Sequence, residues 1–152
     1  MTQEEVIQIL SGFVGTLGFG VLFNIRGVRL AVTAVGGLLS WLLFVLLKGV
    51  IPAEPLNYFL VALVMAVYAE IMARVLKTPT TTFIITSLVP LIPGGSLYYT
   101  MSSAFAGDLT GFLERALYTL QLAASLALGI IVATAATRIL NEKLGSRIKQ
   151  HP

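Results

Sequence analysis

The sequence predicts an all-α integral membrane protein of about five transmembrane helices, the fourth of them broken at a Pro-Gly motif. Hydrophobic residues make up 57% of the 152 residues and charged residues only 11%, whereas a soluble domain carries roughly 25% charged residues. Charge-free stretches close to the length that a spanning helix needs, about 20 residues, recur along the chain. These observations predict a single transmembrane domain over residues 1–152.

The first two predicted spans are joined by a short basic turn. They cover about residues 5–24 and 29–49, and the turn NIRGVR occupies 24–29. Two glutamates precede the first span in place of a basic region, so we interpret it as a retained helix and not as a signal peptide. Glycines on both spans suit close helix packing; they are Gly12, Gly15, Gly18, Gly20, Gly36 and Gly37.

The third predicted span contains a charged residue, and the fifth lies between two arginines. The third covers about 56–76 and must run past Glu70, because the charge-free stretch before that residue is too short to cross a bilayer. The fifth covers about 115–140, and GDLTGFLER (107–115) is the predicted external connection before it. The turn IPAEP (51–55) separates the second span from the third.

The fourth predicted span, about 79–106, has an unusual composition. The 30 residues between Lys77 and Asp108 carry no charge but include three prolines and three glycines. As one straight helix they would extend about 45 Å, while the hydrocarbon core of a bilayer is about 30 Å thick. A break is therefore predicted at VPLIPGGS (89–96). Broken helices persist at membrane depth mainly where they line a polar cavity, and in transporters they often form the substrate site.

The basic residues predict the orientation of the chain. In a five-span arrangement eight of them fall on one side: Arg26, Arg29, Arg74, Lys77, Arg138, Lys143, Arg147 and Lys149. Only Lys48 and Arg115 fall on the other side. Because basic loops stay in the cytoplasm, the N-terminus is predicted to lie outside and the C-terminus inside. Two crossings by the fourth segment would put the basic tail outside, so one net crossing fits better.

The break supplies the first candidate substrate-binding residues. Pro90 and Pro93 lack backbone donors, and Gly94 and Gly95 let the backbone turn and approach a ligand closely. A helix that starts near Ser96 would direct free N–H groups and its positive dipole end at the break, which suits a carboxylate. The alternative interpretation is a kink that serves packing alone.

Hydroxyl groups and tyrosines extend this candidate pathway. Thr82 and Ser87 belong to a run of hydroxyl side chains before the break, and Tyr98 follows it. The hydroxyls either bind a polar substrate or bond to carbonyls one turn back and to neighbouring helices. Tyr98 either lines the pathway or is one of the aromatic residues typical of membrane interfaces.

Glu70 and Arg74 lie four residues apart on one face of the third predicted span. Ionisable groups within a membrane usually face the interior, a cavity or a partner, so one interpretation is a gating or coupling ion pair. The other is a pair at the edge of the membrane, with Arg74 extended toward the headgroups.

Other function classes are disfavoured by what the sequence lacks. There is no cysteine, and the one histidine is His151, so no metal site is predicted. No nucleophile–base pair, phosphate-binding loop or dinucleotide-binding glycine pattern occurs. We therefore do not expect an enzyme, and we expect no cofactor. The basic residues sit at membrane edges, so nucleic-acid binding is not expected.

The run KTPTTTFIITSLVPLIPGGSLYY (77–99), which follows a span ending AEIMARVL, resembles the membrane region of the threonine/serine exporter (ThrE-like) family, and in particular its small five-span membrane subunit. The resemblance covers nearly the whole chain. The family pattern would fall on Pro79, Thr82, Pro90, Pro93, Gly94, Gly95 and Tyr98.

The resemblance implies a multi-pass protein of the inner or plasma membrane that exports threonine and serine. It also implies a partner, because this chain lacks the second five-span half of fused members and the cytosolic domain that goes with that half. Two inverted five-span units would form an inverted repeat. The alternatives are export of succinate or another dicarboxylate, and a non-transporting subunit that assembles a catalytic partner.

Overall fold

The computed structural model describes residues 2–148, with side chains as far as Leu140. Every regular element in this part of the chain is helical, which confirms the all-α prediction. The elements are α1 (Gln3–Leu22), α2 (Val28–Lys48), α3 (Glu54–Val75), α4 (Thr80–Ser87), the short 3-10 helix η1 (Val89–Leu91), α5 (Gly94–Phe105) and α6 (Leu109–Ile148).

Four of these helices are long and apolar enough to cross a membrane, namely α1, α2, α3 and the Leu109–Leu140 part of α6. A fifth candidate is the pair formed by Thr80–Ser87 and Val89–Phe105, whose two halves are bent by 42° at the break. The prediction of about five spans with a broken fourth is thus confirmed. The protein is an all-α membrane protein.

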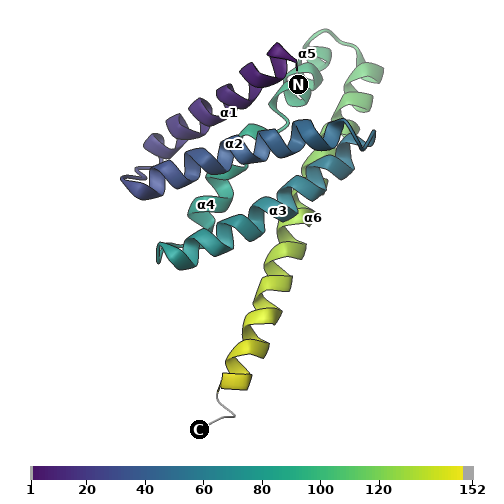
Figure 1. Ribbon diagram of the computed structural model, residues 1–152. Helices are drawn as coiled ribbons and strands as arrows, with labels where there is room; N and C mark the ends of the chain where they lie inside the picture. The colour runs from purple at the N-terminus through teal and green to yellow at the C-terminus, as the bar shows by residue number, and fades with distance from the viewer. Residues whose placement is uncertain (1, 149–152) are drawn as a thin grey trace.

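The helices alternate in direction, so their connections gather at two ends of the bundle (Figure 1). The α1–α2 and α3–α4 turns lie at one end, which we call the Arg74 end. The α2–α3 and α5–α6 turns lie at the other, which we call the Glu54 end. α6 crosses beside α3 and runs on beyond the other helices (Figure 1).

The start of α6 differs from the prediction. The helix begins at Leu109, so Glu114 and Arg115 lie within its first two turns and not in an external connection. Asp108 causes the early start, because one of its carboxylate oxygens accepts a hydrogen bond from the Gly111 N–H at 2.9 Å and so caps the helix. At the other end α6 continues to Ile148, beyond the predicted limit at residue 140.

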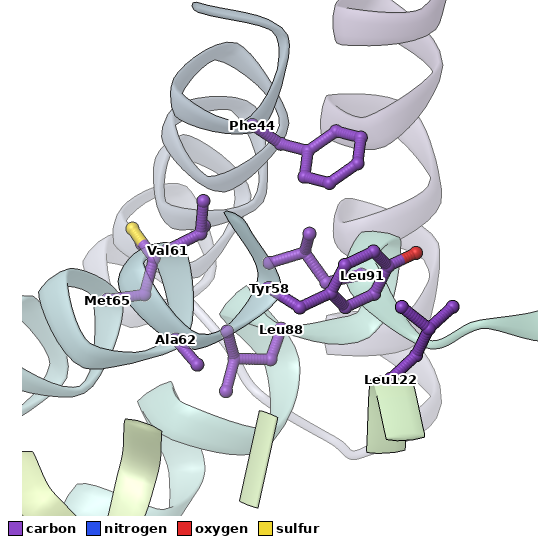
Figure 2. Close-up of a cluster of buried hydrophobic side chains, with 8 residues drawn as sticks. All are labelled: Phe44, Tyr58, Val61, Ala62, Met65, Leu88, Leu91 and Leu122. Carbon is purple, nitrogen blue, oxygen red and sulfur yellow. The ribbon is translucent and has the colours of Figure 1, made fainter. Parts of the chain in front are cut away.

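The broken segment is anchored in the main hydrophobic core. Leu88 precedes the 3-10 turn of the break and Leu91 ends it, and both are buried against α3 and α6 (Figure 2). Their cluster comprises Phe44, Tyr58, Val61, Ala62, Met65, Leu88, Leu91 and Leu122. A second cluster, formed by Phe83 with Ala69 and Ala73, fixes α4 on α3 nearer the Arg74 end. The break therefore lies inside the bundle and has a defined position.

Glycines set the spacing of several helices, but not all of those predicted to do so. A Cβ on Gly20 would lie 2.5 Å from a Leu30 methyl group, and one on Gly37 would lie 1.9 Å from the Thr16 hydroxyl oxygen, so α1 and α2 approach closely. Gly15 and Gly18 were expected to pack in the same way, but nothing lies within 4 Å of a Cβ built on either one. They occupy the outer face of α1.

Candidate functional site

The break consists of one 3-10 turn between two short helices. The Leu91 N–H donates to the Leu88 carbonyl at 2.9 Å, which makes the tight turn of η1 around Pro90. Pro93 then precedes the first residue of α5. Because a proline has no N–H, it leaves no unpaired donor at the start of the helix. α5 begins at Gly94, two residues before the expected start near Ser96. The chain therefore changes direction at the break while it stays within the core.

A hollow lies beside the break, between α1, α2 and η1. Its volume is about 300 Å³, and Gln8, Ser11, Gly12, Trp41 and Pro90 line it. The indole N–H of Trp41 is buried and has no hydrogen-bond partner among residues 2–140. Buried tryptophan N–H groups usually find a partner. We call this space the break hollow; a helix break, the Trp41 side chain and two polar side chains line it.

Two buried hydroxyl groups flank the same region of α2. Ser87 of α4 faces Gly36, and Thr16 of α1 faces Gly37. Both hydroxyls are fully buried, and neither oxygen has a hydrogen-bond partner in the part of the chain whose side chains are described. By contrast, Thr86 follows the alternative interpretation of the hydroxyl run, because its hydroxyl donates to the Thr82 carbonyl at 2.7 Å. Ser87 thus differs from the threonine one residue before it.

The remaining predicted binding residues are not gathered at one closed site. Thr82 lines a separate hollow of about 190 Å³ near the Arg74 end, with Phe23 and Ile25 of the α1–α2 turn. Gly94 and Gly95 are exposed, and a Cβ on either would meet nothing within 4 Å. Tyr98 is 68% exposed.

Ser96 faces a different space, between α5 and α6. It lines a pocket of about 260 Å³ together with Tyr99, Glu114, Arg115 and Tyr118. We call this the α5–α6 pocket. The predicted residues therefore divide among the break hollow, the α5–α6 pocket, the Thr82 hollow, the open face of α5 and, for Ser87, the buried contact with α2.

Glu70 and Arg74 form the predicted ion pair, with Arg74 Nη2 2.8 Å from Glu70 Oε1. Glu70 has a second partner, because the Thr80 hydroxyl donates to its other carboxylate oxygen at 3.1 Å. Arg74 lies in the last turn of α3 and its side chain is 51% exposed. Thr80 is the first residue of α4, where the helix dipole favours a negative charge. The carboxylate thus connects the end of α3 to the start of α4.

Some residues of these spaces were missed by the sequence analysis. Trp41 was not singled out, although a single tryptophan within a span is a candidate for a buried donor. Gln8 and Ser11 gave no signal, because their relation to Pro90 depends on how α1 packs on η1. Arg115 was assigned to a loop; Asp108, a preferred capping residue, was the available sign that the helix begins earlier. His151 and Lys149 lie outside the described residues.

These features define a class of protein: an all-α membrane protein with one broken span and polar groups held at the break. The family model described as Threonine/Serine exporter, ThrE matches residues 8–136, so the chain belongs to this transporter family. The resemblance noted in the sequence is therefore confirmed. No curated protein and no solved structure matches the chain.

Proposed function

We propose that this chain is one subunit of a secondary exporter that moves small carboxylate-bearing metabolites, threonine and serine first, out of the cell through the inner or plasma membrane. The observation that carries the proposal is the break hollow beside Pro90. Irregular backbone within a membrane protein is tolerated where it is buried in protein or lines a polar space, and in many transporters it is where the substrate binds.

A second membrane subunit completes the proposed pathway. The predicted residues on α5 that are exposed in this chain, Gly94, Gly95 and Tyr98, are then covered by that partner. The partner has an inverted five-span half and the cytosolic domain that fused members carry. With the N-terminus of this chain outside and its C-terminus in the cytoplasm, the two halves form an inverted repeat, with the substrate at their interface.

Two alternatives give different results in the same experiment. An exporter of succinate or another dicarboxylate would move that substrate in place of threonine. A non-transporting subunit that only assembles or localises its partner would affect the amount of the complex and not the flux through each complex.

The test is efflux of threonine, serine and succinate from preloaded cells. Cells would produce this chain alone, this chain with a candidate partner that carries an inverted five-span half, or the pair with Gly94→Leu. Gly94 suits this test because a side chain there meets nothing within 4 Å in the chain itself. The variant should therefore fold, and a loss of flux would reflect a contact with substrate or partner.

We expect the pair to export threonine and serine, and Gly94→Leu to abolish efflux while the amount of protein is unchanged. Gly15→Leu is the matched control, because Gly15 is also open but lies on the outer face of α1. Unchanged flux with Gly94→Leu would contradict a pathway at the break. A C-terminal reporter that is active outside the cell would contradict the proposed orientation.

A further inference from the structure

The α5–α6 pocket contains both signs of charge in a small space. Glu114 and Arg115 line it from the start of α6, and Ser96 and Tyr99 line it from α5. Neither charge forms an ion pair with another residue in the described part of the chain. Its volume of about 260 Å³ suits a small metabolite, since pockets for drug-sized ligands begin at about 300 Å³.

Contacts around the pocket hold its aromatic walls in place. The Arg115 guanidinium lies over the Tyr99 ring, with its central carbon 5.8 Å from the ring centroid. The Tyr118 hydroxyl donates to the Glu54 carboxylate at the start of α3. The Thr119 hydroxyl lies 3.2 Å from that of Thr100, which adds a direct bond between α5 and α6 next to the pocket. Arg115 is therefore held in position, and its N–H groups have no carboxylate partner among the residues whose side chains are described.

We propose that this pocket binds the zwitterionic head of a free α-amino acid, with the ligand carboxylate on Arg115, the ligand ammonium on Glu114 and the Ser96 hydroxyl beside them. A guanidinium presents donors in a fork that matches a carboxylate, and an ionised carboxylate accepts from an ammonium. The proposal rests on the proposed function in one respect, because it takes the ligand to be the exported metabolite at the Glu54 end of the pathway.

The same charges disfavour a dicarboxylate. A dicarboxylate brings two negative charges to a pocket with one cation, Arg115, and with Glu114 in its lining. Glu54, held against Tyr118, adds a further negative charge nearby. Like charges at short range cost binding free energy, so the pocket selects an amino acid over succinate. This distinction separates the two substrate classes that the family resemblance leaves open.

The test measures binding to the purified full-length chain in detergent or nanodiscs by calorimetry. The probes are L-threonine, L-serine, succinate and L-threonine methyl ester, which lacks the carboxylate charge. The variants are Arg115→Gln, Glu114→Gln and Ser96→Ala. The matched controls are Lys48→Gln and Glu4→Gln, which remove exposed charges at the same end of the bundle but outside the pocket.

We expect threonine and serine to bind, and succinate and the ester to bind at least about tenfold more weakly. Arg115→Gln and Glu114→Gln should each weaken threonine binding about tenfold or more, Ser96→Ala less, and the controls should match the wild type. Glu114→Gln should also reduce the difference in affinity between threonine and succinate.

Failure of this proposal is distinguishable from failure of the proposed function. The proposal is overturned if the wild-type chain does not bind threonine, if succinate binds as well, or if Arg115→Gln and Glu114→Gln bind like the controls. Binding as expected without efflux from cells would leave the site in place and remove the exporter function. Efflux that is unaffected by these variants would leave the exporter in place and remove the pocket from its pathway.

Discussion

Ser87 of α4 packs against the bare backbone of Gly36 on α2, so closely that a Cβ on Gly36 would come within 2.2 Å of the Ser87 hydroxyl oxygen. Without a side chain at Gly36, α4 lies directly on α2 just before the chain breaks. Small residues at such contacts are how helices in membranes achieve close packing. The contact therefore fixes the position of the break relative to the second span.

Gly36→Ala should destabilise the protein by about 1–3 kcal/mol, because the added methyl group overfills a packed contact. Thermal unfolding in detergent would measure this. Gly15→Ala is the control: it adds the same methyl group in open space and should be neutral or stabilising, since alanine favours helix over glycine by about 1 kcal/mol. Ser87→Gly in the Gly36→Ala background should restore most of the loss, and its failure to do so would contradict this account of the contact.

Gly129→Ala should be more damaging than Gly36→Ala. A Cβ there would lie 2.5 Å from the Phe59 carbonyl oxygen and 3.0 Å from the Leu63 backbone nitrogen. A backbone cannot rotate away as a side chain does, so α6 would have to move off α3. We expect a loss of about 3 kcal/mol or more, measured by unfolding in detergent. A loss no larger than that of Gly36→Ala would show that α6 shifts easily.

Glu70 is expected to stabilise the α3–α4 turn. Thr80→Val removes its hydrogen bond to Thr80 and keeps the ion pair, while Glu70→Gln removes the charge. If stabilising this turn is the only role of Glu70, each substitution should lower stability by no more than about 1 kcal/mol, as for exposed ion pairs, and leave efflux per complex unchanged. Thermal unfolding in detergent would measure the change in stability, and efflux assays over a range of pH would measure the flux. Loss of flux in Glu70→Gln alone, with normal flux in Thr80→Val, would establish the gating or coupling role instead.

Trp41→Phe should weaken export while the protein still folds. The substitution keeps an aromatic ring in the break hollow and removes the indole N–H, which has no partner in the described structure. If the donor serves the substrate, the concentration for half-maximal efflux should rise by up to about tenfold. Tyr68→Phe is a useful contrast: it removes a hydroxyl bonded to the Val32 carbonyl at 2.8 Å, outside the hollow, and should lower stability but not flux. Unchanged efflux in Trp41→Phe would exclude the hollow from the pathway.

The sequence was sufficient to predict those features that depend on local chemistry. Pro90, Pro93 and Gly94 together exclude a continuous helix, so the break and its place could be predicted from a few residues. The third span was predicted to run past Glu70, and α3 ends at Val75. These features follow from hydrogen bonding along the backbone and from the length that a bilayer requires.

Features that depend on packing between distant segments could not be predicted. Gly15 and Gly37 are indistinguishable as letters, yet one faces open space and the other is in contact with Thr16. The difference arises from how each helix, α1 or α2, is rotated about its own axis against its neighbours. The same holds for the break hollow, where Trp41 and Pro90 are brought together only by the docking of η1 on α2. The early start of α6 was a local signal that was missed, because Asp108 was treated as surface charge and not as a cap.

The length of α6 has a practical consequence. Its 40 residues extend about 60 Å, roughly twice the hydrocarbon thickness of a bilayer. Past its contact with α3, the C-terminal end of α6 runs clear of the other helices (Figure 1). A chain of 16.3 kDa offers little outside the membrane by which single particles could be aligned in electron microscopy. A soluble helical protein fused in phase with α6 would extend this helix as a stiff lever, and its orientation in an image would report the tilt of the fifth span.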